Sequence, residues 1–147
     1  RSMNHEFYMA RALQLARLGL YSTSPNPRVG CVIVNNGEIV GEGWHQKAGE
    51  PHAEVNALRM AGDSARGATA YVTLEPCTMC AGAIANARIR KVIFAAEDEK
   101  GGAVVNGVKF FDQPTCHWHP EISMGPFAEE SSDMLREFFR SRRKKAD

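Results

Sequence analysis

The spacing of apolar and polar residues predicts regular elements along most of the chain. Apolar residues recur at helical spacing from about Asn4 to Gly19, and Asn4 can cap the amino end of that helix. Val29 to Val34 is a mostly β-branched, apolar run, as expected of a strand covered on both faces. Asn36-Gly37 favours a tight hairpin turn into a second strand over residues 38–44. The chain is therefore expected to open with a helix and an antiparallel hairpin.

Beyond residue 50, helices and strands alternate. The expected elements are a helix over 53–61, a strand over 68–74, a helix over 77–87, a strand over 91–96, a short strand over 121–123 and a final amphipathic helix over about 127–143. Strand-helix-strand repetition implies parallel pairing with right-handed crossovers. The predicted fold class is α/β, a three-layer α/β/α sandwich around a mixed sheet of roughly five strands. Residues 97–120 lack a regular pattern and are long enough to suggest a functional loop.

Length and composition are those of one ordinary domain, assigned to residues 3–147. Arg1-Ser2, ahead of Met3, is expected to be an expression remnant. The formal net charge of +1 gives no overall attraction to nucleic acid or membrane, although basic residues gather near the carboxyl end. No run approaches about 18 consecutive apolar residues, and the amino end lacks a signal or transit pattern. We therefore expect a soluble, cytoplasmic protein without a membrane partner.

Two short motifs carry the candidate chemistry: His52-Ala53-Glu54 and Pro76-Cys77-Thr78-Met79-Cys80. Zinc prefers nitrogen and sulfur ligands, and a catalytic zinc keeps one of its four tetrahedral positions for water. His52, Cys77 and Cys80 would fill the other three. A helix that begins at the proline places both cysteines in its first turns, where free backbone N–H groups and the helix dipole stabilise thiolates. The Cys-x-x-Cys pair also suits a reducing compartment better than a disulfide framework.

Glu54 is the candidate catalytic residue because its carboxylate lies two residues from His52. It can accept a proton from the water and then deliver protons to the ring nitrogen and the departing amine of a nucleobase. The arrangement H-x-E…P-C-x-x-C is the known sequence pattern of zinc-dependent nucleobase deaminases. Two alternatives stay open at this point. One is a structural zinc site completed by Cys116, His117 or His119, and the other is a Glu54 that is an ordinary solvated helix residue.

At these motifs the chain resembles the cytidine deaminase superfamily, and the resemblance covers nearly its whole length. The resemblance implies a hydrolase that removes an exocyclic amine from a nucleobase, nucleoside or nucleotide, with Zn²⁺ as cofactor and a homodimer as the assembly. From Tyr21 to Cys77 the chain is similar to the deaminase domain of the bifunctional riboflavin-pathway enzymes. In that family, the residues that match Asn26 and His45 help to hold a pyrimidine nucleotide.

From Cys77 onward the chain is more similar to the tRNA adenosine deaminases. The spacing Cys77-Thr78-Met79-Cys80 lacks the longer insertion in which the riboflavin-pathway enzymes carry residues that bind the substrate phosphate. Asp98 aligns with an aspartate in the substrate-side loop of the tRNA enzymes. The segment 138–143 matches their helix motif for the anticodon loop, which implies nucleic-acid contacts by Phe139, Arg142 and Arg143. Cations at the end of a helix also offset its dipole without any ligand, so the basic tail has a second interpretation.

The predicted substrate contacts are Asn26, Trp44, His45, Asp98 and His117. Asn26 is held between two prolines, and Trp44-His45 offers an aromatic wall beside a polar group, although a plain turn residue and a core tryptophan are the alternatives. The sequence departs from the tRNA enzymes at His45, where they have Asn, and at 117–121, where they have Asn-His-Arg-Val-Glu. Both changes are expected near the pocket.

The first predicted substrate is an adenine-type base, in tRNA or in a smaller nucleoside. The alternatives are an aminopyrimidine nucleotide of riboflavin biosynthesis and another small nucleoside or base, such as a guanine or cytosine derivative. A more remote alternative is a non-catalytic, zinc-containing RNA-binding subunit. In all but the last of these, the same three ligands and Glu54 are expected to do the chemistry, so these possibilities differ in the substrate and not in the reaction.

Overall fold

The computed structural model describes residues 4–19, 27–46 and 49–146, with residues 141–146 described as backbone only. Asn26 lies outside these ranges, as do the side chains of Arg142 and Arg143. None of the helices that the structure describes combines the length and the apolar character needed to cross a membrane.

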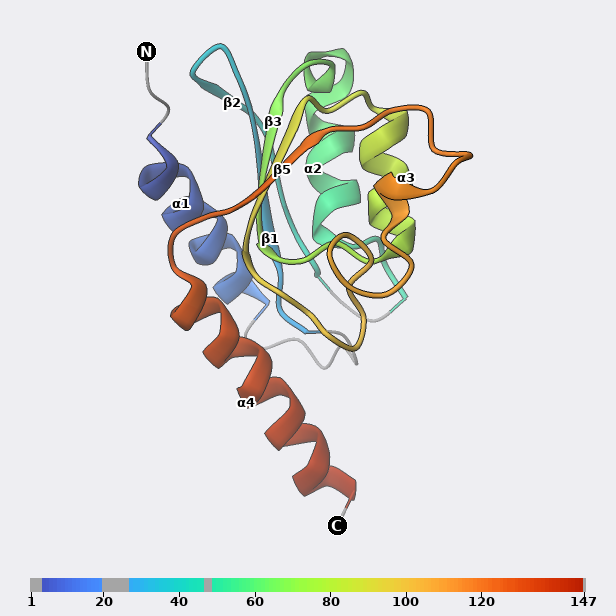
Figure 1. Cartoon of the computed structure of the whole chain (residues 1–147). Helices are drawn as coiled ribbons and strands as arrows, with labels where there is room; N and C mark the ends of the chain where they lie inside the picture. Colours follow the sequence, from blue (N-terminus) through green and yellow to red (C-terminus); the bar gives the residue numbers. More distant parts are fainter. Residues whose placement is uncertain (1–3, 20–26, 47–48, 147) are drawn as a thin grey trace.

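One mixed sheet forms the centre of the molecule, with the strand order β2-β1-β3-β4-β5 (Figure 1). The strands are β1 (Gly30–Asn35), β2 (Glu38–Trp44), β3 (Thr69–Leu74), β4 (Lys91–Ala96) and β5 (Glu121–Met124). β1 pairs antiparallel with β2 and β3, whereas β3, β4 and β5 run parallel. The mixed sheet of five strands and its antiparallel hairpin confirm the fold class predicted from the sequence.

Helices cover both faces of this sheet (Figure 1). On one face lie α1 (His5–Leu18) and α4 (Ala128–Ala146), and on the other lie α2 (Ala53–Ala61) and α3 (Thr78–Asn86). Because side chains alternate along a strand, Val32 of β1 packs with α1 while Cys31 and Ile33 pack with α2 and α3. Each Val or Ile buried in these two layers contributes about 1.5–3 kcal/mol. The two cores fix the helices relative to the sheet.

Two glycines in β2 let α2 lie directly on the hairpin. A Cβ at Gly41 would lie 2.2 Å from the carbonyl oxygen of Ala57, and one at Gly43 would lie 2.2 Å from that of Ala53. Real side chains cannot approach a backbone oxygen so closely, so the strand needs glycine where it faces the helix. This contact sets the position of the first turn of α2, and with it the residues around His52.

The segment 97–120 is irregular, as predicted, and holds one short 3-10 helix, η2 (Phe110–Asp112). Its first part lies beyond the carboxyl end of β4, next to the end of β3. Its last part returns to the other end of the sheet, where Trp118 Nε1 donates a hydrogen bond to the carbonyl oxygen of Ile89, just before β4. The two parts of this segment therefore lie at opposite ends of the parallel strands.

Candidate zinc centre and substrate cavity

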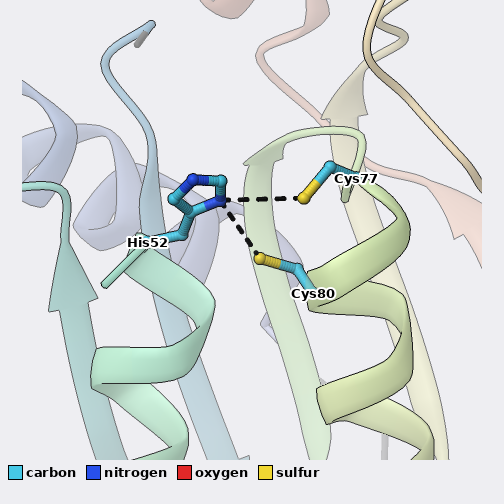
Figure 2. A group of neighbouring side chains, drawn as sticks. All are labelled: His52, Cys77 and Cys80. Carbon is cyan, nitrogen blue, oxygen red and sulfur yellow. Dashed lines mark hydrogen bonds between the residues drawn. The ribbon is translucent and has the colours of Figure 1, made fainter. Parts of the chain in front are cut away.

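Three candidate metal ligands meet at the amino ends of two helices (Figure 2). His52 is the N-cap residue of α2, Cys77 is the N-cap residue of α3, and Cys80 lies in the first turn of α3. His52 Nδ1 lies 3.7 Å from Cys77 Sγ and 3.4 Å from Cys80 Sγ. A tetrahedral zinc would separate a nitrogen and a sulfur ligand by about 3.6 Å. The donor set and its spacing therefore fit zinc.

The described residues offer no fourth protein ligand at this point. Within the ranges 4–19, 27–46 and 49–140, the group of neighbouring histidine, cysteine and carboxylate side chains that could hold a metal is His52, Cys77 and Cys80. Cys116 instead donates to the carbonyl oxygen of Trp118, and His119 pairs through Nδ1 with that of Phe111. These contacts keep both residues away from the site. The structural zinc site that they were considered to complete does not form, so one metal position is left for water.

The two cysteines form a coupled pair before any metal is bound. The pKa of Cys77 is lowered to about 5, chiefly because the Cys80 thiol donates a hydrogen bond to the Cys77 sulfur, with burial acting in the opposite direction. The same hydrogen bond and burial raise the pKa of Cys80. Zinc is bound by thiolates, so the metal would need both cysteines to lose their protons.

Glu54 lies in the first turn of α2 and is only 4% exposed. Burial raises the pKa of this carboxyl group to about 7. It borders a cavity of about 170 Å³ that His52 and Cys77 also line, so a proton carried by Glu54 is available to a molecule held beside the metal. The burial argues against the alternative in which Glu54 is an ordinary solvated residue.

The cavity also brings His45 and Asp98 to the metal ligands. The His45 ring meets the His52 ring edge to face, with 5.7 Å between centroids, and its pKa is lowered by burial and by the neighbouring His52. Asp98 follows β4, and its Oδ1 atom accepts hydrogen bonds from the N–H groups of Lys100 (3.2 Å) and Gly101 (3.0 Å). The remaining lining residues are Pro27, Val29, Ala53, Leu74, Glu75 and Gly101. The two polar side chains stay candidates for holding a substrate.

Trp44 does not line this cavity, which corrects the prediction of an aromatic wall. Gly43 faces α2, so the alternation of β2 turns Trp44 to the opposite face of the sheet, where it packs against the cluster that includes Met9 of α1. The alternative of a core tryptophan is the one observed.

His117 is likewise not brought to the cavity. Its side chain is exposed, and the neighbouring Trp118 packs beside Arg88 and Ile89, at the opposite end of β4 from Asp98. The loop that carries His117 crosses the molecule before β5 begins, and spacing along the chain does not reveal this crossing. The expectation that the departure at 117–121 lies near the pocket is therefore wrong.

The predicted nucleic-acid contacts lie on α4. Phe139 borders a groove of about 440 Å³ between α4 and the ends of β4 and β5, and the Lys100 amino group lies 4.5 Å from the centroid of its ring. Asp98 lines both this groove and the cavity, so the two are neighbours. A role for Phe139, Arg142 and Arg143 in binding nucleic acid stays a prediction.

Glu75 was not predicted as a site residue, although it lines the cavity and is 3% exposed. Burial acts to raise the pKa of its carboxyl group, but hydrogen bonds from the Asn106 side chain and from the backbone N–H groups of Asp98, Val104 and Asn106 outweigh it, so the pKa is lowered. The available sequence signal was a charged residue directly after the apolar run 68–74 and directly before Pro76-Cys77. Glu75 is thus a second buried carboxylate beside Glu54.

One histidine and two cysteines at helix starts, with an open metal position and a buried glutamate beside them, define a zinc-dependent hydrolytic deaminase. The chain belongs to the family described as the cytidine and deoxycytidylate deaminase zinc-binding region, whose sequence model matches residues 2–96. This confirms the superfamily, the enzyme class and the zinc cofactor predicted from the motifs.

Individual relatives fall into two groups. The riboflavin biosynthesis protein RibD of Escherichia coli K12 is 46% identical over 96% of this chain, which spans 39% of that protein. The diaminohydroxyphosphoribosylamino-pyrimidine deaminase of Buchnera aphidicola subsp. Schizaphis graminum is 44% identical over 96% of this chain and 97% of its own length. A solved structure from a study of A-to-I editing by tRNA:A34 deaminases is 39% identical, with a TM-score of 0.76 over 88% of this chain and 99% of that one. The chain is thus similar to both branches.

Proposed function

We propose that this protein deaminates the diaminohydroxyphosphoribosylamino-pyrimidine of riboflavin biosynthesis. The similarity to the Buchnera enzyme, 44% identity along nearly the whole of both chains, carries this proposal. This similarity supports the aminopyrimidine nucleotide, the alternative substrate of the sequence analysis, over the adenine-type base that was predicted first. His45 and Asp98 support the proposal because both face the cavity, where they can hold the polar edge of a pyrimidine.

The size of the cavity suits one ring of the substrate. Its volume of about 170 Å³ is below the roughly 300–1,000 Å³ typical of sites for drug-sized ligands. The base would therefore enter with its amine toward Cys77 and Glu54, and the ribosyl phosphate would lie outside, past Asp98. Gly101 also lines the cavity beside Asp98 and adds no side chain there.

In the proposed reaction, Glu54 moves the protons. His52, Cys77 and Cys80 would hold the zinc, whose chemistry would be to acidify a water beside the amine-bearing ring carbon. Glu54 would take one proton from that water and give it to the ring nitrogen as the remaining hydroxide bonds to the ring carbon. It would then take the second proton, from the new hydroxyl group, and pass it to the amine as the C–N bond breaks and the ring carbonyl forms. Water and the aminopyrimidine are consumed, and a ring carbonyl and ammonia are formed. Ala53 and Leu74, both buried, add apolar surface to the lining of the cavity.

A second candidate function is deamination of adenosine in tRNA. It is favoured by the short spacing Cys77-Thr78-Met79-Cys80 and by the structural match over 99% of the tRNA-editing chain. Phe139 beside Lys100 would form part of a surface for RNA. In this case the binding should be steeply salt-dependent, because Arg142 and Arg143 would release counterions from the RNA backbone.

One assay separates the two candidates. Ammonia release by the zinc-loaded protein is measured on the aminopyrimidine nucleotide, tRNA, adenosine, guanine and cytosine, with the Glu54→Gln variant as the inactive control. The proposal expects release from the aminopyrimidine nucleotide at the highest kcat/KM, and a higher value for tRNA would reverse the order. Truncation after Phe139 should leave the pyrimidine reaction unchanged, whereas it should abolish activity on tRNA if tRNA is the substrate. The predicted homodimer is tested by sedimentation of the same sample.

A further inference from the structure

Five N–H groups converge on the carboxylate of Glu75, at the point where β3 ends. Its Oε1 atom accepts from Asp98 N (3.0 Å) and Asn106 Nδ2 (2.7 Å). Its Oε2 atom accepts from the backbone N–H groups of Val104 (2.9 Å), Val105 (2.8 Å) and Asn106 (3.0 Å). One side chain thus ties together both ends of the segment 98–106.

These contacts leave Glu75 no capacity for the reaction itself. A carboxylate offers about four lone-pair sites, and five donors already share them. A substrate N–H group would have to displace a backbone donor, which would then be buried without a partner at a cost of about 1–3 kcal/mol. Glu75 therefore differs from Glu54, and its effect must pass through the residues that it holds.

Of the residues that donate to Glu75, Asp98 is the one that lines the cavity. Its backbone N–H donates to Glu75, its carbonyl oxygen accepts from Gly102 N (2.8 Å), and its Oδ1 atom caps the turn at residues 100 and 101. A Cβ at Gly102 would lie 2.4 Å from the Glu75 carboxyl carbon, so the loop backbone is in direct contact with this side chain. The other oxygen of Asp98 accepts no hydrogen bond from the described residues, and Asp98 borders the cavity.

The same backbone segment leads to the metal. Glu75 N donates to the carbonyl oxygen of Ala96 (2.9 Å), and Ala103 N donates to that of Pro76 (2.9 Å), the residue before the ligand Cys77. The end of β3 is therefore bonded on one side to β4 and on the other to the loop. Cys77, a candidate metal ligand, is therefore only two residues along the chain from Glu75, which holds the segment 98–106.

We propose that Glu75 is a positioning residue for substrate: it fixes the segment 98–106 so that the free oxygen of Asp98 meets the substrate at a set distance from the metal. The proposal rests on the proposed contact between Asp98 and substrate, and it holds for any nucleobase substrate. Glu75 would act as a buried anion surrounded by N–H donors, which orders a loop without exchanging protons.

The test is a double-mutant cycle between Glu75→Gln and Asp98→Asn in the zinc-loaded protein. Glutamine keeps the shape of the side chain but turns an NH₂ group toward two or more N–H donors. Because a displacement of about 1 Å can cost roughly 100-fold, kcat/KM should fall about 10–100-fold, mainly through KM, with zinc content equal to wild type. In the Asp98→Asn background, Glu75→Gln should lower kcat/KM by at most about twofold, because the effects of coupled residues are non-additive.

Glu97→Gln is the matched control, since Glu97 accepts one hydrogen bond from the same Asn106 amide and is exposed. Its kcat/KM should stay within about twofold of wild type. A full 10-fold loss from Glu75→Gln in the Asp98→Asn background would overturn the proposal, as would unchanged kinetics or a loss of zinc. If Glu75→Gln fails to fold, Asn106→Ala replaces it, because it removes the 2.7 Å bond to Glu75 and leaves the four backbone donors in place; the other bond it removes is the 3.2 Å one to the exposed Glu97. That variant should raise KM about threefold or more, again only when Asp98 is intact.

The cycle is run on whichever substrate the wild-type protein deaminates. Ammonia release from tRNA alone would overturn the aminopyrimidine assignment while the cycle on tRNA still tests Glu75. If the effects of Glu75→Gln and Asp98→Asn on kcat/KM for the aminopyrimidine nucleotide are additive, the role of Glu75 is overturned, whereas the assignment of that substrate stands. The two failures therefore give different results.

Discussion

Two carboxylates, one at the start of α2 and one at the end of β3, are almost equally buried beside the same cavity, yet their protons behave differently. Glu54 is 4% exposed and Glu75 is 3% exposed. Burial raises the pKa of Glu54 to about 7, whereas the pKa of Glu75 is lowered. Burial acts in the same direction on both groups, so the opposite outcome comes from the five N–H donors around Glu75.

The difference separates two uses of a buried carboxyl group. A group that must exchange protons near neutral pH needs a pKa in that range, which burial with few donors provides. A group that must stay ionised and hold a loop needs many donors. The cavity contains one of each, supplied by different elements, so the two properties can be changed separately by mutation.

Removing the metal should abolish the activity on which the comparison of Glu54 with Glu75 depends. Cys80→Ala takes away one of three ligands, so zinc content and ammonia release should both fall to background. The thermal midpoint should also fall, because binding of zinc to the folded state alone stabilises it. Cys116→Ala is the control, since this buried cysteine lies outside the metal group and should keep stoichiometric zinc. Activity that survives in Cys80→Ala would contradict the ligand assignment.

Glu54→Gln should separate chemistry from structure. We expect kcat to fall about 10²–10⁴-fold, the usual contribution of a general acid and base, while zinc content stays at the wild-type level. The free energy of unfolding should stay the same or rise, because the change removes a buried ionisable group with few partners. Kinetics, metal analysis and urea unfolding on one preparation measure all three. An active Glu54→Gln variant would show that another group carries the proton.

Glu75→Gln, in contrast to Glu54→Gln, should lower the free energy of unfolding. At least two buried N–H donors lose their acceptor, so the free energy of unfolding should fall by about 3 kcal/mol or more. Glu99→Gln, at an exposed position of the same segment, should change it by less than about 0.5 kcal/mol. Urea unfolding compares the three proteins. Equal stability of the Glu54 and Glu75 variants would contradict the assignment of different roles.

Gly43→Ala should disturb the first turn of α2, which carries Glu54, and leave the surroundings of Glu75 unchanged. The new Cβ would lie 2.2 Å from the carbonyl oxygen of Ala53, so the first turn of α2 must move and the protein should lose about 1–3 kcal/mol of stability. Activity should fall with it, because His52 and Glu54 lie on that turn.

Gly82→Ala in α3 serves as the comparison, because its Cβ would meet only the Phe110 ring at 3.7 Å. Alanine favours the helix, so this variant should gain up to about 1 kcal/mol. Thermal unfolding of the two variants gives the difference. A stabilised Gly43→Ala protein would show that α2 does not depend on close contact with β2.

The parts of the molecule that were predictable from the sequence depend on near neighbours. Asn36-Gly37 specifies its hairpin, and the spacings within His52-Ala53-Glu54 and Cys77 to Cys80 specify metal ligands at helix starts, because each involves one turn of chain. The substrate side depended on distant residues. The face to which Trp44 turns is set by the packing of α2 on Gly43, and the place of His117 is set by the path of a long loop.

Glu75 shows why some site residues escape prediction from sequence alone. Four of its five donors are backbone N–H groups 23 to 31 positions later in the chain. Backbone groups are present at every residue, so no residue type marks them. Only the fold, which brings the segment 98–106 over the end of β3, shows that the carboxylate has partners.

The order of strands in the sheet also has a consequence for folding kinetics. The hairpin β1-β2 joins neighbours in sequence and can form within microseconds, whereas β3 must find β1 across more than thirty residues and β4 must pair with β3 through a crossover. His52 follows the early hairpin, while Cys77 and Cys80 follow the late strand. A nascent chain therefore exposes its histidine ligand well before the two thiols. We expect zinc to bind tightly only once β3 has docked. Zinc should then affect the rate of the last folding step, while the first steps proceed at the same rate with or without it.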